Sequence, residues 1–377
     1  MPEPFKNLLN PAVVSALGLH LHRAWSGFPR ARFESIALAG LDGLELKARA
    51  HHLCEALEAT LPGPFSRAAE VLEGALAPPY PSEQTSVLAA RDDGVAGWAV
   101  WPMTEYVARR GRADVGRALA VLHAMTQRFS AEWAIRPFLL EHPAETYATL
   151  ARWALDPSAH VRRLVSEGSR PRLPWGMVLK PLIADPSPSL PLLRALQDDP
   201  SEYVRRSVAN HLNDIAKDHP AVVVAWLRAH LPGAPAPRRA LLRHASRTLI
   251  KQGHPEVLAA WGLGAPLRGK VTFALEPGRI ELGEAIELSL VIHATAKTPQ
   301  RVIVDYAVHH VKADGGSAAK VFKGWALELG PGETRALRKR HAVKPITTRK
   351  YYAGKHRVEV LVNGRPVGEA AFVLDLT

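Results

Sequence analysis

The 377-residue sequence contains one cysteine, Cys54. A single cysteine excludes an internal disulfide and any cysteine-based zinc site, and it fits the reducing cytoplasm. No apolar run approaches the ~18 residues that a membrane span needs, and the N-terminus lacks the basic-then-apolar form of a signal peptide. We therefore expect a soluble, cytoplasmic protein that does not associate with a membrane.

Motifs of several common enzyme classes are also missing. The sequence has no His-Glu-x-x-His pattern, no phosphate-binding glycine-rich loop and no Gly-x-Ser-x-Gly. The doublets His51-His52 and His309-His310 place neighbouring side chains on different faces of a helix or strand, so surface histidines are a simpler interpretation than metal ligands. We expect neither a metal nor a cofactor.

Basic residues outnumber acidic ones, with 48 Lys and Arg against 36 Asp and Glu, a net charge of +12. This excess indicates an acidic partner, either nucleic acid or an anionic membrane surface, although simple solubility would also explain it. The 47% hydrophobic content argues against disorder, and the length predicts two domains.

Two segments that begin 43 residues apart repeat the same pattern: Asp156-Pro157-Ser158-Ala159-His160-Val161-Arg162-Arg163 and Asp199-Pro200-Ser201-Glu202-Tyr203-Val204-Arg205-Arg206. Each closes one apolar helical run and opens another, which is typical of stacked helix pairs of the HEAT kind. We interpret Asp156 and Asp199 as turn and cap residues. The repetition predicts a row of arginines along one face, and such a face suits a polyanion.

The apolar spacing is helical from Pro11 to about Gly262, with short helices ended by proline or glycine. It predicts a helix pair within residues 33–57, a helix over 67–76 and another over 115–128. After about Gly264 the period changes to two, and seven strands are expected at 270–275, 286–292, 302–308, 321–329, 335–343, 357–362 and 369–376. Asn363-Gly364 predicts a two-residue hairpin.

These patterns predict a multidomain protein. An all-α HEAT-like repeat solenoid should span residues 1–263, and a small all-β immunoglobulin-like sandwich should span 266–377. The sandwich lacks the Cys…Trp…Cys pattern of antibody domains, so the likeness is one of architecture.

Three acidic residues, Glu132, Glu167 and Asp214, lie in helical segments that otherwise hold small or apolar residues. Each belongs to a different helix pair, so a solenoid can bring them together across its groove. Sequence spacing leaves ordinary roles open: Glu132 pairing with Arg136, Glu167 with Arg163, Asp214 with Lys217, and Trp175 in a core. Glu105 and Glu141 are possible further groove acids without an assigned place.

The blocks 131–138, 160–175 and 203–217 resemble the AlkC family of bacterial alkylpurine DNA glycosylases, relatives of the HEAT-like AlkD family. The most specific match is the middle block, with Arg170-Pro171-Arg172-Leu173-Pro174-Trp175 at its end. The resemblance covers residues 90–260 well, and a C-terminal β domain fits the branch of that family in which an Ig-like domain follows the helices. The first 80 residues carry little of it.

The resemblance implies a monofunctional glycosylase that hydrolyses the N-glycosidic bond of cationic alkylated bases, chiefly 3-methyladenine and 3-methylcytosine, in double-stranded DNA. Glu132, Glu167, Asp214 and Trp175 match the active-site positions of the family. No lysine nucleophile is required, so no Schiff base is expected. The ranking of these two bases and 7-methylguanine stays open.

DNA contact is expected from two regions of a protein that we predict to be a monomer. In the solenoid the candidates are Arg162, Arg163, Arg170, Arg172, Arg205, Arg206, Lys217, Arg243 and Arg247. In the β domain, Arg349, Lys350 and Tyr351 lie in a basic and aromatic loop, 347–356, which could instead be solvated with its tyrosines packed on the sandwich. The alternative function is a non-catalytic HEAT-repeat scaffold that binds nucleic acid or an acidic protein; an RNA-directed HEAT protein is a third, disfavoured reading.

Overall fold

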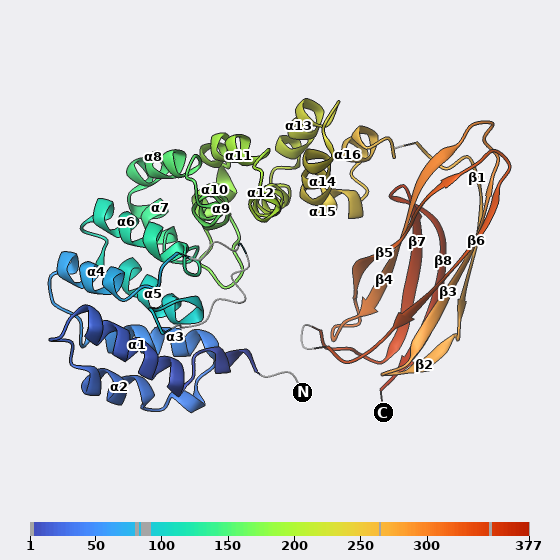
Figure 1. The fold of residues 1–377 in the computed structure, drawn as a ribbon. Helices are drawn as coiled ribbons and strands as arrows, with labels where there is room; N and C mark the ends of the chain where they lie inside the picture. The colour runs from blue at the N-terminus through green and yellow to red at the C-terminus, as the bar shows by residue number, and fades with distance from the viewer. Residues whose placement is uncertain (1–3, 80–82, 84–91, 264, 347–348, 377) are drawn as a thin grey trace. The chain divides into compact units, whose positions relative to one another are not determined.

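The structure, a computed structural model, describes residues 4–79, 83, 92–263, 265–346 and 349–376 (Figure 1). Its contacts divide the chain into two compact units. The first comprises Met1–Asp218 with Ala236–His244, and the second comprises His219–Pro235 with Ala245–Thr377. Because helices α13, α15 and α16 group with the strands, the predicted boundary between residues 263 and 266 stays a prediction.

Helices occupy the chain as far as Ala260 and strands begin at Gly269, which confirms the predicted order of an all-α region and an all-β region. The helices are η1 (Phe5–Leu8), α1 (Pro11–Ala24), α2 (Arg30–Leu38), η2 (Leu41–Gly43), α3 (Leu46–Glu58), α4 (Phe65–Gly74), η4 (Gly97–Ala99), α5 (Val100–Arg110), α6 (Val115–Thr126), α7 (Arg136–Glu141), α8 (Pro143–Trp153), α9 (Ala159–Gly168), α10 (Lys180–Ala184), η5 (Ser187–Ser189), α11 (Leu190–Leu196), α12 (Glu202–Ile215), α13 (Pro220–His230), α14 (Ala236–Ala245), α15 (Arg247–Lys251) and α16 (Pro255–Ala260).

In the first unit, successive helices pack layer on layer (Figure 1). Helix α1 contacts α2, α3 contacts α5, α8 contacts α9, and α9 contacts α12. The predicted helix pair within 33–57 is confirmed as α2 and α3, and Gly40, with φ of 72°, provides the left-handed turn residue between them. The helices predicted over 67–76 and 115–128 are confirmed as α4 and α6.

The two copies of the repeat form the same turn before α9 and α12. Asp156 Oδ1 accepts a hydrogen bond from the Ser158 amide at 2.8 Å, and Asp199 Oδ1 accepts one from the Ser201 amide at 2.9 Å. These bonds confirm the aspartates as turn residues, because an aspartate that bonds the backbone two residues ahead mimics a backbone turn. Their predicted role as helix caps was wrong, since Ser158 and Ser201 are the N-cap residues of α9 and α12. The repeat therefore places α9 and α12 in equivalent positions.

In the second unit, eight strands form two sheets within residues 265–346 and 349–376. The strands are β1 (Gly269–Glu276), β2 (Arg279–Glu281), β3 (Ala285–Ala294), β4 (Gln300–Val311), β5 (Ser317–Leu329), β6 (Thr334–Ala342), β7 (Gly354–Val362) and β8 (Arg365–Asp375). One sheet has the order β1-β3-β6 and the other β2-β8-β7-β4-β5. Ile286 and Leu288 of β3 pack in one core with Val358 and Val360 of β7, all fully buried, which confirms the sandwich.

The predicted hairpin at Asn363-Gly364 is confirmed between β7 and β8. Both residues have positive φ, 49° and 74°, as a type I′ turn requires. The sequence prediction missed β2, which pairs in parallel with β8 over three residues. Three residues are too few to show alternation, so only the pairing with β8 defines this strand.

Candidate active site

The three acidic side chains lie in one buried cluster of the first unit. Glu132 precedes α7, Glu167 lies in the last turn of α9, and Asp214 lies in the last turns of α12; the residues are 8%, 6% and 2% exposed. Two arginines, Arg163 and Arg170, bridge the three carboxylates in one continuous chain of ion pairs. The structure thus brings together acids that are 35 and 47 residues apart in sequence.

Glu132 forms one end of this acid–arginine chain. Its Oε2 accepts hydrogen bonds from Ser130 Oγ, at 2.8 Å, and from Arg163 Nη1. Among the described residues, Oε1 of Glu132 accepts no hydrogen bond. The Arg163 guanidinium also lies over the Tyr203 ring, 5.4 Å from its centroid, which restricts its orientation.

Glu167 lies at the centre of the chain. Its Oε1 accepts from Arg170 Nη1 at 2.5 Å and lies 3.6 Å from Arg163 Nη2, and its Oε2 accepts from Ser207 Oγ at 2.6 Å. Burial opposes ionisation of this carboxyl, but the charges of Arg163 and Arg170 and its hydrogen bonds outweigh burial and hold its pKa below the ordinary value. Glu167 is therefore a carboxylate at neutral pH.

Asp214 forms the other end. Its Oδ2 accepts from Arg170 Nε at 2.9 Å, and its Oδ1 accepts from Lys217 Nζ at 2.9 Å. Three carboxylates thus face three cations, Arg163, Arg170 and Lys217, and the cluster is neutral when all are ionised. Such compensation is what permits buried charges, since an unpaired buried charge is strongly unfavourable.

Trp175 is exposed rather than part of a core. Its residue is 58% exposed and its φ is 62°, a left-handed conformation that costs a non-glycine residue about 1–2 kcal/mol. Its carbonyl oxygen accepts from Lys47 Nζ at 3.1 Å, and its ring is parallel to that of Trp101 within 5°, with centroids 6.5 Å apart. Trp101 in turn stacks on Trp133 at 4.5 Å.

Arg136 holds the loop that carries Trp175. This arginine is fully buried, and its guanidinium donates to the carbonyl oxygens of Gly168, at 2.7 Å, and Met177, at 2.8 Å. Burial and the nearby charge of Arg170 lower its pKa to about 10, so it remains a cation at neutral pH. The sequence offered Arg136 only as a helical partner of Glu132, whereas Glu132 pairs with Arg163.

Comparisons with known proteins identify the family of the chain. The model of a family described as "Uncharacterised protein YhaZ, C-terminal Ig-like domain" matches residues 270–376. The uncharacterized protein YhaZ of Bacillus subtilis is 36% identical over 365 residues, which cover 95% of this chain and 96% of YhaZ. The solved structure of the Pseudomonas fluorescens alkylpurine DNA glycosylase AlkC, bound to DNA containing an abasic site analog, is 38% identical, with a TM-score of 0.89 over 99% of this chain and 100% of that chain.

The chain belongs to the AlkC family. The resemblance inferred from the three sequence blocks is thereby confirmed, together with the helical region followed by an Ig-like domain. No helix in the described part of this AlkC-family chain is long and apolar enough to cross a membrane. Within the same residues, no group of three His, Cys, Asp or Glu side chains lies in a position to hold a metal ion.

The structure separates the predicted DNA-binding residues of the helical region by their contacts. Arg162 binds Asp199 through Nε at 2.6 Å and Nη2 at 2.9 Å, and it also donates to the carbonyl oxygen of Asp156 at 2.8 Å. Arg205 donates to the carbonyl oxygens of Asp199, at 2.5 Å, and Pro200, at 2.8 Å. Both guanidinium groups thus close turns, and DNA contact by them stays an untested prediction.

The other predicted cations differ in their surroundings. Arg163, Arg170 and Lys217 bind the acid cluster, and Arg172 pairs with Asp218. Arg206 is exposed, whereas Arg243 and Arg247 are half-buried. Glu105 lies 3.5 Å from Arg109 and Glu141 lies 2.8 Å from Arg112, so these two acids are paired outside the cluster.

The basic and aromatic loop of the β domain is described from Arg349 onward, and Thr347 and Thr348 lie outside the described residues. Arg349 lies over the Tyr351 ring at 5.9 Å from its centroid, and Lys350 lies over the Tyr352 ring at 5.6 Å. Tyr351 is partly buried against the sandwich core, as the alternative interpretation supposed, while Lys350 is exposed. DNA contact by this loop stays a prediction.

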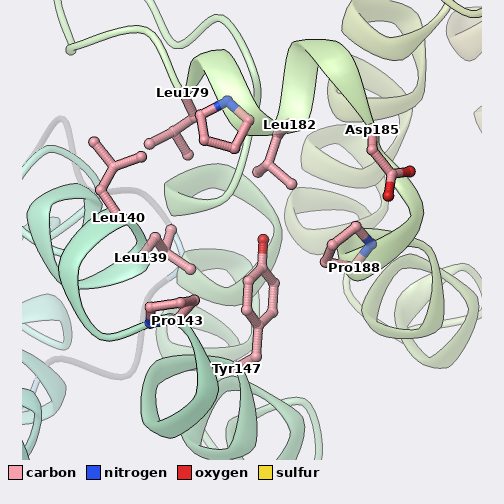
Figure 2. A pocket seen from close by; sticks show the side chains of 9 residues that line it. Leu139, Leu140, Pro143, Tyr147, Leu179, Leu182, Asp185 and Pro188 are labelled. Atoms are coloured by element: carbon pink, nitrogen blue, oxygen red, sulfur yellow. The ribbon is translucent and has the colours of Figure 1, made fainter.

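A well-formed pocket elsewhere in the first unit has a different character. Figure 2 shows it between Leu139 and Leu140 of α7, Pro143 and Tyr147 of α8, and the segment around α10; its volume is about 260 Å³. Its lining is apolar apart from the Tyr147 hydroxyl and Asp185, whose carboxylate accepts hydrogen bonds from Ser187. Because none of the predicted site residues lines it, this pocket is not the candidate active site.

Proposed function

We propose that this protein is a monofunctional DNA glycosylase that hydrolyses the N-glycosidic bond of cationic alkylated bases, such as 3-methyladenine and 3-methylcytosine, in double-stranded DNA. The observation that carries the proposal is the chain of ion pairs that joins Glu132, Glu167 and Asp214. Membership of the AlkC family, whose Pseudomonas fluorescens member is an alkylpurine DNA glycosylase, supports the same activity.

The chemistry needs negative charge at the sugar rather than an acid at the base. An N3-alkylated purine is already a cation, so it departs with the electron pair of the C1′–N bond and becomes neutral without prior protonation. The barrier is then set by the positive charge that develops on the deoxyribose. Fixed carboxylates beside that charge stabilise the transition state, and one such contact is worth about 3 kcal/mol.

The arginine bridges suit this task because they hold the three carboxyl groups in place before DNA arrives and lower the pKa of Glu167. Glu167 uses both oxygens in contacts with Arg170 and Ser207, whereas Glu132 keeps Oε1 for a substrate. We assign Glu132, Glu167 and Asp214 to the stabilisation of the sugar cation and to orienting the water that adds to C1′. One proton of this water stays on the new C1′ hydroxyl, and the other passes to a carboxylate or to solvent.

Trp175 is the fourth proposed catalytic residue. Its exposed indole is fixed by the Lys47 hydrogen bond and by its parallel arrangement with Trp101. A ring held in this way presents its electron-rich face to a sugar cation, an interaction of about 0.5–2 kcal/mol. It can also exclude water from the face of the sugar that it covers.

DNA binding is proposed for the exposed cations, Arg206 and Lys350 among them, because exposed guanidinium and ammonium groups neutralise phosphates. The single cysteine, which is buried and free, fits action in the cytoplasm. A non-catalytic scaffold is the weaker candidate, since a pure polyanion binder gains nothing from three carboxyl groups gathered among its basic side chains.

The decisive experiment incubates the protein with methylated duplex DNA and measures free 3-methyladenine. We expect release by the wild type, and loss of at least about a hundredfold in rate for Glu167→Gln and Asp214→Asn, with DNA affinity retained. Glu141→Gln, an acid paired with Arg112 outside the cluster, serves as the matched control and should excise normally. Wild-type rates in both cluster variants would refute the catalytic assignment, and binding without release by the wild type would favour the scaffold.

A further inference from the structure

A pocket of about 720 Å³ lies between the N-terminal segment and Trp175. Its lining includes two exposed aromatic residues, two lysines and one carboxylate: Phe5, Trp175, Lys6, Lys47 and Glu45. None of the three acids of the cluster lines this pocket, although the proposed catalytic Trp175 does, so the three carboxylates do not account for it.

The N-terminal wall of the pocket is anchored. Helix η1, which begins with Phe5, is held by Arg49, a residue only 3% exposed. The Arg49 guanidinium donates to the carbonyl oxygens of Lys6, at 3.1 Å, Leu9, at 2.9 Å, and Leu44, at 2.9 Å. Phe5 is 70% exposed and yet belongs to a fixed wall, which is the arrangement of a binding platform rather than of a loose terminus.

The opposite wall joins the pocket to the candidate active site. Trp175 is fixed by Lys47 and is parallel to Trp101, and its loop is held by Arg136. The same loop begins with Arg170, which binds both Glu167 and Asp214. A ligand in this pocket therefore contacts the chain segment that shapes the acid cluster.

The chemistry of the lining matches one ligand class. Exposed aromatic faces accept planar bases by stacking, and lysines bind phosphates. The one lining carboxylate, Glu45, is already paired with Lys6 at 3.3 Å, so the lining carries a net charge of +1 from Lys6, Lys47 and Glu45. This charge favours an anion and disfavours a free cationic base.

We propose that the pocket binds an unstacked nucleotide of the damaged DNA beside Trp175, with its base against Phe5 and its phosphate at Lys6 and Lys47. The inference rests on the proposed function, because it is DNA bound at the acid cluster that brings a nucleotide to this wall. It adds a nucleotide-binding site near residue 5, in the part of the chain where the sequence motifs showed little resemblance to the family.

Photo-crosslinking tests the base contact. The full-length protein is bound to a duplex that contains an abasic-site analogue, with 5-iodouracil in place of one thymine at a time, and irradiated at long wavelength. We expect one position to crosslink to Phe5, identified by peptide mass spectrometry. Absence of a Phe5 crosslink at every position of either strand would overturn the proposal.

Affinity measurements test the pocket as a whole. Phe5→Ala should weaken binding of the same duplex by about tenfold, since stacking on one aromatic side chain is worth that much. Lys47→Met should also weaken it and make its salt dependence shallower, because one phosphate contact is lost. Leu155→Ala and Lys180→Met, which remove an exposed apolar and an exposed basic side chain elsewhere, are the controls and should bind as the wild type does.

The outcomes separate this proposal from the proposed function. If the wild type releases 3-methyladenine but Phe5→Ala and Lys47→Met bind the duplex normally, the pocket proposal fails and the glycosylase stands. If the wild type releases no base, the proposed function fails first. Competition by free 3-methyladenine that depends on Phe5 would show that the pocket takes the product, and would overturn the nucleotide assignment.

Discussion

The two copies of the repeat differ at one position in a way that explains the site. In both copies the first arginine, Arg162 or Arg205, donates to the carbonyl oxygens of the preceding Asp-Pro turn. The second arginine diverges: Arg163 lies between Glu132 and Glu167, whereas Arg206 is exposed at the edge of a pocket of about 380 Å³ between α12 and α14. The pattern therefore forms a turn in both copies, and only in the first copy does it also contribute an arginine to the candidate active site.

The neighbours decide the difference. The residue four positions after Arg163 is Glu167, and its counterpart after Arg206 is Asn210, whose side chain bonds His244. A carboxylate at that position draws the guanidinium inward, and a neutral amide leaves it in solvent. The repeated sequence thus gives both copies the same backbone turn, and the side chains around the second arginine decide whether it is buried or exposed.

The largest expected difference in stability is between variants that lack the second arginine of the first copy and of the second copy. Arg163→Met leaves Glu132 and Glu167 without a shared counter-charge and should lower the free energy of unfolding by about 3–5 kcal/mol. Arg206→Met should change it by less than about 0.5 kcal/mol, because the side chain is exposed. Urea unfolding measures both, and equal losses would show that the two arginines are equivalent after all.

The Arg206→Met variant should instead bind DNA more weakly, with a shallower dependence of affinity on salt, because one phosphate contact is lost. Fluorescence anisotropy at several salt concentrations measures this slope. An unchanged slope would remove Arg206 from the proposed DNA-binding surface.

A smaller difference is expected for the first arginines. Arg205→Ala removes hydrogen bonds to two carbonyl oxygens and should cost about 1–2 kcal/mol of stability. Arg162→Ala should cost about 1–2 kcal/mol more than that, because it also strips the buried Asp199 carboxylate of its partner. Thermal or urea unfolding of the two variants tests the order.

The smallest effect is a pH dependence centred on Glu167. Its pKa is lower in the folded protein than in the unfolded chain, so ionisation stabilises the fold above the unfolded pKa of about 4.3, and this stability is lost as pH falls through the folded pKa. The difference in unfolding free energy between the wild type and Glu167→Gln should therefore shrink on acidification from pH 7. A difference that grows instead would mean that Glu167 is protonated in the native state.

Much of the fold could be predicted from the sequence because the signals are local. Apolar spacing identified α2, α3, α4 and α6, Asp-Pro-Ser marked both repeat turns, and Asn363-Gly364 marked the hairpin. The three-residue strand β2 was missed, since its existence depends on β8, 94 residues later by the register of Arg279 with Val373. The three acids were selected from their unusual surroundings and from the family resemblance.

What the sequence determined by itself is the periodicity: which segments are helices or strands, where they turn, and which acids sit on apolar faces. Only the tertiary structure decided the pairing, so that Glu132 meets Arg163 rather than Arg136, Arg162 closes a turn, and Trp175 stays exposed with a left-handed backbone. The physical reason is distance along the chain. The hydrogen bonds of helices and turns and the hydrophobic spacing act within a few residues, whereas the ion pairs that define the cluster join residues up to 44 positions apart and exist only once the helices have stacked.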